Sequence, residues 1–302
     1  MTVIPQRIID AHHHLWDLDA VHYPWLIEKG QRRFFGDPTP IQKDYRAEDF
    51  QRDFDGLPVT GSVHVQVGAL GHDALKETEW LEGERHRTGF PGAIVAFADL
   101  TALNLEDLLD SQTAASPVLR GVRQIVSRSA EEDNASATPQ LLSNTDFVDG
   151  LRELPKRGLS FDLQLTPKHL VSAADVLGTV DGLRVALCHA GSLHDSSPKG
   201  LKAWTEGLTA FAHQVDGICK ISGYGMFYHE WHRQDIADWV HRIVDIFTPQ
   251  RVAFGSNFPV DSLYASYRTV WEAFFYAAET FTADERDMMF AKNAEAFYRL
   301  SS

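Results

Sequence analysis

The amino-acid sequence predicts a (β/α)8 TIM barrel in which all 302 residues form one domain. Eight short apolar runs, rich in β-branched residues, alternate with longer segments of helical periodicity, as expected for parallel strands joined by helices. Polar side chains end almost every apolar run, and barrel enzymes place their functional groups at the carboxyl ends of the strands. No phosphate-binding glycine motif follows any run, which argues against a doubly wound sheet.

The expected elements follow one another along the whole chain. The predicted strands cover residues 8–15, 61–68, 93–100, 119–126, 159–165, 183–190, 217–223 and 251–257. The predicted helices cover residues 72–88, 104–114, 144–157, 167–178, 200–215, 234–247, 263–280 and 283–299. Prolines near helix starts and glycines after helix ends support these limits: Pro167, Pro198, Gly89, Gly158 and Gly217.

Two connections are longer than a barrel requires. Residues 16–58 are rich in aromatic side chains, so we expect an ordered loop that forms a wall of the pocket, with Trp25 as a candidate for substrate binding. Residues 127–143 are polar, and we expect them to form a mobile lid.

Composition and charge narrow the function classes. The net charge of −14 argues against nucleic acid or an anionic membrane as the partner, and no apolar run approaches the ~20 residues needed to span a bilayer. The first seven residues are too few for a signal peptide. Cys188 and Cys219 lie in apolar runs, as buried free thiols do. The sequence therefore predicts a cytoplasmic protein that acts on a small molecule, and it leaves a homodimer open.

The first strand carries the clearest candidate site. Alternation along a strand puts Asp10, His12 and His14 on one face and His13 on the other. Two imidazoles one strand step apart can converge on a divalent cation. We expect Asp10 to hold one of these histidines through a hydrogen bond.

Polar residues at the other strand ends are expected to meet at the same mouth of the barrel. Each of them alone has an ordinary structural explanation, and their convergence is what favours a function. A lysine that faces into the barrel needs a carboxylate partner, which applies to Lys220. The strand-end residues are His64, Gln66, Asp99, Arg123, Gln164, His189, Lys220, Ser222 and Asn257.

An ordered set of motifs resembles the amidohydrolase superfamily, in particular its amidohydrolase 2 branch. The set covers most of the chain and consists of Asp10-Ala-His12-His13-His14-Leu-Trp16-Asp17, Tyr23-Pro-Trp25-Leu26, Gly121-Val-Arg123, His189-Ala-Gly191, Lys220-Ile-Ser-Gly223 and Phe254-Gly-Ser-Asn257-Phe-Pro-Val260. This branch is similar to lactonases of sugar acids, pyrone dicarboxylates and muconolactones, and more distantly to aminocarboxymuconate-semialdehyde decarboxylase.

The resemblance implies roles for individual residues. His12 and His14 match metal ligands, and His189 matches a histidine that ligates the metal or polarises the substrate carbonyl. Arg123 matches an arginine that, in relatives with acidic substrates, holds a carboxylate or the lactone oxygen. No lysine ends the fourth strand and Gln164 ends the fifth, so at most one ion is expected, zinc or manganese. Several enzymes of the branch are thought to work without a metal, so the sequence leaves metal-free catalysis open.

Asn257 departs from the pattern, because the superfamily usually has an aspartate at this position. An amide cannot accept the proton of an attacking water near neutral pH. Another base is therefore expected, with His189, Asp261 and His64 as candidates. An inactivated Asp→Asn variant and a barrel that only binds are the other two interpretations, and the coherent motif around Asn257 favours the first.

The leading hypothesis is a hydrolase that opens a small polar lactone through an activated water. The catalytic candidates are His189, Asn257, Asp261 and Lys220, and Arg123, Gln66, His64, Gln164 and Trp25 are candidates for substrate binding. Hydrolysis of an amide or cyclic imide, lactone isomerisation and decarboxylation are alternatives within the superfamily. A non-catalytic barrel that binds a metabolite is the alternative from another class.

Overall fold

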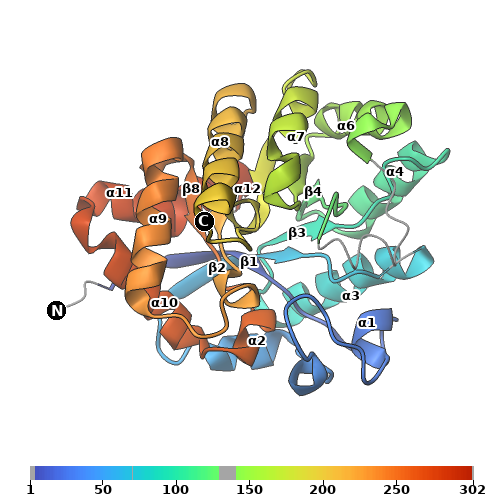
Figure 1. Cartoon of the computed structure of the whole chain (residues 1–302). Coiled ribbons are helices and arrows are strands. Elements are labelled where there is room, and N and C mark those ends of the chain that lie inside the picture. Colours follow the sequence, from blue (N-terminus) through green and yellow to red (C-terminus); the bar gives the residue numbers. More distant parts are fainter. Residues whose placement is uncertain (1–3, 70, 129–140, 301–302) are drawn as a thin grey trace.

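The computed structural model describes residues 4–69, 71–128 and 141–300. Eight parallel strands form one sheet in the order β1-β2-β3-β4-β5-β6-β7-β8, and helices surround this sheet (Figure 1). The backbone N–H of Asn257 donates to His12 O at 2.7 Å, and that of His14 donates to Phe258 O at 2.7 Å. Because these bonds join the ends of the first and last strands, the sheet closes on itself, and the predicted (β/α)8 barrel is confirmed.

The strands fall inside the predicted ranges, apart from the first two residues of β2, and are shorter than predicted. They are β1 Ile8–His13, β2 Val59–Val65, β3 Ala93–Ala96, β4 Leu119–Val122, β5 Ser160–Leu163, β6 Val185–Leu187, β7 Gly217–Ile221 and β8 Val252–Phe254. The residues that follow each strand form loops at the mouth of the barrel. Asn257, which was predicted to end a strand, therefore lies in the loop after β8.

The predicted helices are present between the strands and after the last strand. They are α3 His72–Thr88, α4 Leu105–Ala115, α6 Thr145–Lys156, α7 Leu170–Leu177, α8 Pro198–Gln214, α9 Arg233–Phe247, α10 Tyr267–Ala277, α11 Ala283–Asp287 and α12 Asn293–Tyr298. The connection after β1 is ordered, as predicted, and contains α1 Pro24–Ile27 and α2 Ala47–Asp53. Of the predicted lid at 127–143, residues 129–140 lie outside the described part of the chain.

Two apolar clusters hold the barrel together. The larger lies between the strands and the surrounding helices. The smaller fills the barrel interior with alternate residues of β1, β2 and β3 and with side chains of α12, including Phe297 and Tyr298. Polar side chains gather towards the ends of the strands, where the candidate site lies, and the buried pair of Asp162 and Lys220 lies within β5 and β7.

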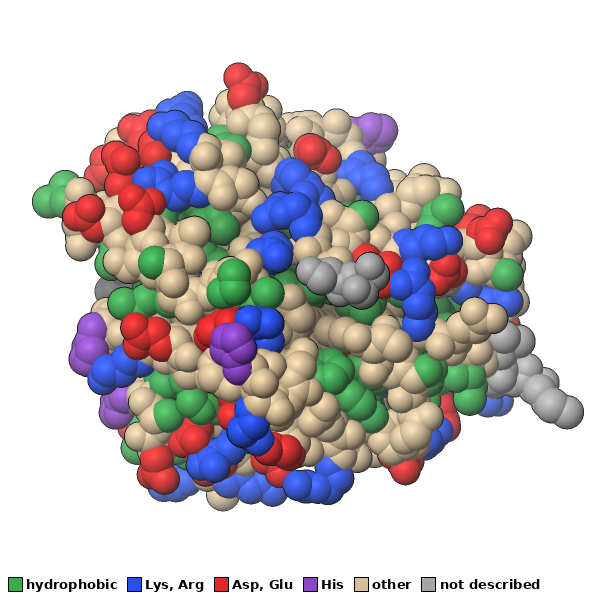
Figure 2. Space-filling view, turned by 180° about the vertical axis from the view of Figure 1, so that it is seen from behind, with side chains coloured by type: hydrophobic (Ala, Val, Ile, Leu, Met, Phe, Trp, Pro, Cys, Tyr) green, Lys and Arg blue, Asp and Glu red, His purple; other side chains and the backbone are tan. Residues whose placement is uncertain are grey.

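The molecular surface carries both signs of charge. On the face shown in Figure 2, acidic and basic side chains are interspersed, and no continuous basic surface is visible there. In the part of the chain that the structure describes, no helix is long and apolar enough to cross a membrane.

Candidate active site

A β-bulge in β1 determines which of its polar side chains face the site. Asp10 pairs with Ser62 and His13 with His64, so three steps along β1 match two steps along β2. The extra residue breaks the alternation of faces. His12 and His14 consequently lie near each other inside the barrel, with ring centroids 5.1 Å apart, while Asp10 faces the helix side.

Asp10 therefore does not hold an imidazole, and that expectation was wrong. Its Oδ1 accepts hydrogen bonds from the backbone N–H of Ser256 at 2.9 Å and of His12 at 3.2 Å. Its Oδ2 accepts a hydrogen bond from the Tyr267 hydroxyl of α10 at 3.1 Å. Burial raises the pKa of Asp10 to about 6. Asp10 joins the bulge of β1 to the loop after β8, and so fixes the backbone on which His12 and Asn257 stand.

Three buried imidazoles form a row at the strand ends. His12 lies between His14 and His189, and its ring centroid is 4.5 Å from that of His189. Neither ring nitrogen of His12 has a hydrogen-bond partner among the described residues. His189 lies in a left-handed turn with φ of 53°, and its Nδ1 is 2.9 Å from the Ser222 hydroxyl. Burial lowers the pKa of all three histidines, so they are neutral at physiological pH.

The hydrogen bonds of His14 leave two acceptors facing each other. His14 Nδ1 is 2.6 Å from Val65 O, and a carbonyl can only accept, so Nδ1 carries the proton. Nε2 of the neutral ring then carries no proton and acts as a hydrogen-bond acceptor. It lies 3.3 Å from Oδ1 of Asn257, which is also an acceptor. Burial lowers the pKa of His14 to about 3, which disfavours a second proton. A cation between the two atoms would satisfy both of them.

Asn257 is held by Asp261 and by its own backbone. Its Nδ2 donates to Asp261 Oδ2 at 2.5 Å, and Asp261 Oδ1 accepts from Gly225 N–H at 3.0 Å. Asn257 has a φ of 57°, in the left-handed region that asparagine tolerates better than most residues. Both side chains are buried, and burial raises the pKa of Asp261 to about 7.

Arg123 brings a positive charge to the site without a direct ion pair to a described carboxylate, and the carboxylates of Asp162 and Glu77 act on it only from a distance. Its guanidinium donates to Gln164 Oε1 at 2.9 Å and to the backbone carbonyl of Gln66, and its Nε has no partner within the described residues. It forms no ion pair with a described carboxylate, although only 5% of its surface is exposed. The charge lowers the pKa of His14 and His189 further. A buried cation of this kind favours an anionic ligand.

Lys220 has the carboxylate partner that its position demands. Its ammonium forms an ion pair with Asp162 of β5, and both side chains are completely buried. The Tyr298 hydroxyl of α12 donates to the same carboxylate at 2.9 Å. The ammonium of Lys220 is therefore held in this ion pair. Its positive charge adds to the effect of burial in lowering the pKa of His12. Asp162 was not identified as this partner from the sequence. A single carboxylate between Phe161 and Leu163 in a buried strand could have indicated a buried ion pair.

Three other predicted residues have mainly structural contacts. The side chain of His64, in β2, faces α3. Its Nδ1 accepts a hydrogen bond from Leu15 N–H at 3.1 Å, and its Nε2 is 4.0 Å from Glu77 Oε1. The side chain of Gln66 accepts from Gly68 N–H at 2.5 Å. The indole of Trp25 donates to Val67 O at 2.7 Å.

Aromatic side chains from three loops surround the mouth at β1, β7 and β8. Trp25 contacts Phe35, Phe34 stacks on Phe227, and the Tyr264 hydroxyl donates to Phe35 O. The long connection after β1 thus packs against the loops after β7 and β8. The connection is therefore packed through its aromatic side chains, and their role as a wall of the pocket stays a prediction.

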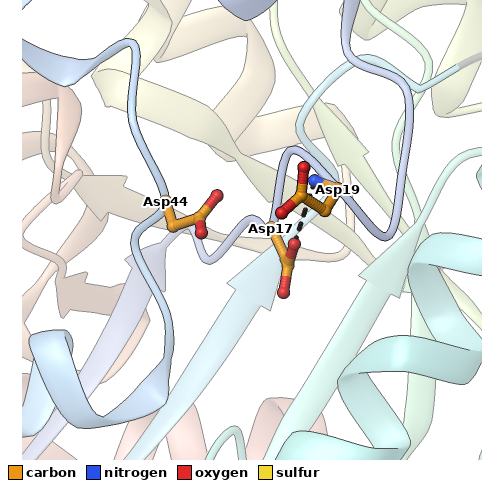
Figure 3. Close-up of side chains that lie close together, drawn as sticks. All are labelled: Asp17, Asp19 and Asp44. Carbon is orange, nitrogen blue, oxygen red and sulfur yellow. Dashed lines mark hydrogen bonds between the residues drawn. The ribbon is translucent and has the colours of Figure 1, made fainter.

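A second cluster of possible metal ligands lies in the connection after β1. Asp17, Asp19 and Asp44 are the only three acidic, histidine or cysteine residues in the described part of the chain whose ligand atoms all lie within 4.8 Å of one another (Figure 3). Arg46 already pairs with Asp17 at 2.9 Å and with Asp44 at 3.0 Å. The remaining oxygens of Asp17 and Asp44 accept backbone N–H groups of this loop. These contacts explain the cluster as loop structure.

Stability is expected to fall in acid because His14 is buried. Its pKa is about 3 in the folded state against 6.5 ordinarily, so between these values only the unfolded chain binds the proton. The free energy of unfolding should therefore rise with pH through this window. His14→Gln, which keeps a donor for Val65 O, should reduce the slope by about 1.4 kcal/mol per pH unit near pH 5. Urea unfolding of chelator-treated protein at several pH values measures both slopes.

The matched control is His86→Gln, at an exposed position in α3, which should leave the slope unchanged. Equal slopes for His14→Gln and the parent would contradict the neutral state of His14.

Comparison with known proteins identifies relatives over the whole chain. A family model described as amidohydrolase matches residues 9–300. An uncharacterized protein of Sinorhizobium fredii, y4mH, is 35% identical over 296 residues, which cover 97% of this chain and 98% of the relative. An L-fucono-1,5-lactonase of Burkholderia multivorans is 26% identical over 304 residues, which cover 97% of this chain and 96% of the relative.

Solved structures agree on the fold. An amidohydrolase from Burkholderia multivorans with bound zinc superposes with a TM-score of 0.80 at 24% identity, over 97% of this chain and 99% of the other. The family match includes all the motifs from Asp10 to Asn257, and the resemblance inferred from them is confirmed. The chain belongs to the amidohydrolase family and is a hydrolase.

Proposed function

We propose that the protein hydrolyses a small polar lactone that carries a carboxylate or a comparable oxygen function. The observation that carries the proposal is the juxtaposition of three neutral, buried imidazoles with the guanidinium of Arg123, which has no direct ion pair to a described carboxylate. The lactonase among the relatives supports a cyclic ester as the substrate class. Asn257 supports it as well, because an ester oxygen leaves more readily than an amide nitrogen and depends less on an acidic side chain.

We propose His12, His14 and Asn257 as the holders of one divalent cation, zinc or manganese. The ligand atoms of the three predicted histidines, His12, His14 and His189, do not all lie within 4.8 Å of one another. His12 offers two ring nitrogens without partners, and His14 Nε2 and Asn257 Oδ1 face each other as acceptors. These three residues would hold the ion, with His189 next to them. When bound, such an ion polarises a carbonyl and lowers the pKa of a bound water.

The protein's own side chains bind the substrate and transfer the protons. Arg123 grips a substrate carboxylate or the oxyanion that develops during attack, since its fork of donors suits planar oxygen groups. His189 is neutral and accepts the proton of the attacking water. The same imidazole then protonates the ring oxygen as the lactone opens. Ser222 orients His189 through the bond at Nδ1.

The state of the cysteines bears on the cellular compartment of the protein. Both cysteines are buried free thiols, which supports a reducing compartment such as the cytoplasm. We propose a small-molecule substrate as the main partner.

Hydrolysis of L-fucono-1,5-lactone, other aldonolactones, a muconolactone and 2-pyrone-4,6-dicarboxylate tests the proposal. We expect the parent to open at least one of them, and His12→Ala/His14→Ala to reduce kcat/KM by at least about 100-fold, with a parallel loss of bound metal. His86→Ala, at an exposed position, is the control and should match the parent. The proposal fails if the double variant is as fast as the parent, or if lactones bind without turnover.

A further inference from the structure

Asp261 stands directly behind Asn257, on the side away from His14. The Asn257 amide has two chemically different ends, and its Nδ2 lies 2.5 Å from Asp261 Oδ2. An ionised carboxylate only accepts hydrogen bonds and an NH2 group only donates them, so with Asp261 ionised the amide cannot turn around without losing this bond. Its carbonyl oxygen is thereby directed toward His14 Nε2, 3.3 Å away.

We propose that Asp261 is a positioning residue that fixes the Asn257 amide, so that Asn257 presents an oxygen ligand to the imidazole row. Asn257 and Asp261 then act as one unit in place of a single aspartate. The inference deepens the proposed function, and only its metal-binding arm rests on that function.

The orientation of Asp261 is itself determined by its surroundings. Its Oδ1 accepts from the backbone N–H of Gly225 at 3.0 Å, in the loop after β7. Its own N–H donates to Asn257 O at 3.2 Å, which closes a turn between the two residues. At 4% exposure, Asp261 has little water to satisfy it in any other orientation. Two loops thus determine which end of the amide faces the site.

The same geometry explains why an aspartate at position 257 would be unfavourable here. Asn257→Asp would bring two buried carboxylates to about the present 2.5 Å separation. Two carboxylates at such a distance have no donor between them and repel each other, so the bond that fixes the side chain at position 257 is lost. The variant that restores the usual aspartate of the superfamily is therefore expected to be impaired.

Exchanging the two side chains should repair this conflict. In Asn257→Asp/Asp261→Asn, the amide at position 261 can donate to the carboxylate at position 257. Its carbonyl can still accept from Gly225 N–H, so every hydrogen bond of the pair is kept with one direction reversed. In Asp261→Asn alone, the two donors of Asn257 and Gly225 compete for one carbonyl oxygen.

A double-mutant cycle tests the proposal in two readouts. The first is the thermal unfolding midpoint of chelator-treated protein for the parent, the two single variants and the exchange. Each single variant should lower the midpoint by roughly 3–8 °C, and the exchange should recover most of this loss. Additive losses in the exchange would overturn the proposal, whatever the substrate proves to be.

The second readout is zinc affinity, measured by calorimetric titration with zinc alone. Asp261→Asn should weaken binding by about 10–100-fold although Asn257 is unchanged, and the exchange should bind at least as tightly as the parent because it offers a carboxylate oxygen. Asp181→Asn, at an exposed position before β6, is the matched control and should bind as the parent does. Unchanged affinity in Asp261→Asn would overturn the proposal. Absence of zinc binding in the parent would instead refute the metal site of the proposed function, while the unfolding cycle still decides the positioning role.

Discussion

Asp162→Asn should lower the free energy of unfolding by about 3–5 kcal/mol, because it leaves the buried ammonium of Lys220 without a counter-charge. Lys220 and Asp162 are both fully buried, so water cannot replace the lost partner. The Tyr298 hydroxyl would also lose its charged acceptor, which loosens α12 against the barrel interior. Urea unfolding followed by circular dichroism measures the change.

Two comparisons separate the loss of charge from the loss of volume. Asp162→Leu/Lys220→Met removes both charges and should cost much less than Asp162→Asn, since two apolar side chains of similar size can replace a buried ion pair. Glu206→Gln breaks the exposed pair with Lys202 in α8 and should have no measurable effect. A loss below about 1 kcal/mol in Asp162→Asn would mean that Lys220 does not depend on this carboxylate.

His189→Asn should reduce kcat for lactone hydrolysis by about 100- to 10,000-fold while the protein stays folded. Asparagine suits the left-handed backbone at this position, where φ is 53°, so the structural disturbance is small. The amide can also keep a hydrogen bond to Ser222, but it cannot accept a proton from water. Steady-state kinetics on the best substrate, with the unfolding midpoint measured in parallel, provides the test.

The matched variant for this prediction is Ser222→Ala. It removes the partner of His189 Nδ1 but leaves the imidazole, so a loss of roughly 10-fold is expected. A decrease of less than 10-fold in His189→Asn would assign the proton transfer to another group.

Much of the fold is predictable because its signals are local. Alternating apolar runs and helical periodicity place all eight strands and the helices between them, and Pro198 and Gly89 mark helix limits that the structure reproduces. The gathering of His12, His14, His189, Arg123 and Asn257 follows from the rule that barrel strand ends share one mouth.

The errors concern features that depend on partners far away in the sequence. Asp10 was placed with the histidines because alternation assumes a regular strand, and the bulge opposite β2 is not visible in the sequence of β1. The bond between Asn257 and Asp261 depends on a left-handed residue that turns the chain back on itself. To predict Asp162 as the partner of Lys220, one must know which inward-facing side chain lies opposite the lysine in the barrel.

The position of the site at the junction of β1 and β8 has a consequence for folding. Asp10 binds the backbone of Ser256 across 246 residues of sequence, and Asn257 binds His12 across a similar separation. Contacts of such high sequence separation are expected to form late, because closing so long a loop costs chain entropy before the contact stabilises the fold. No half of this barrel can therefore carry the donor set. Catalytic competence should appear only in the final closure step, which makes activity a sensitive reporter of complete refolding.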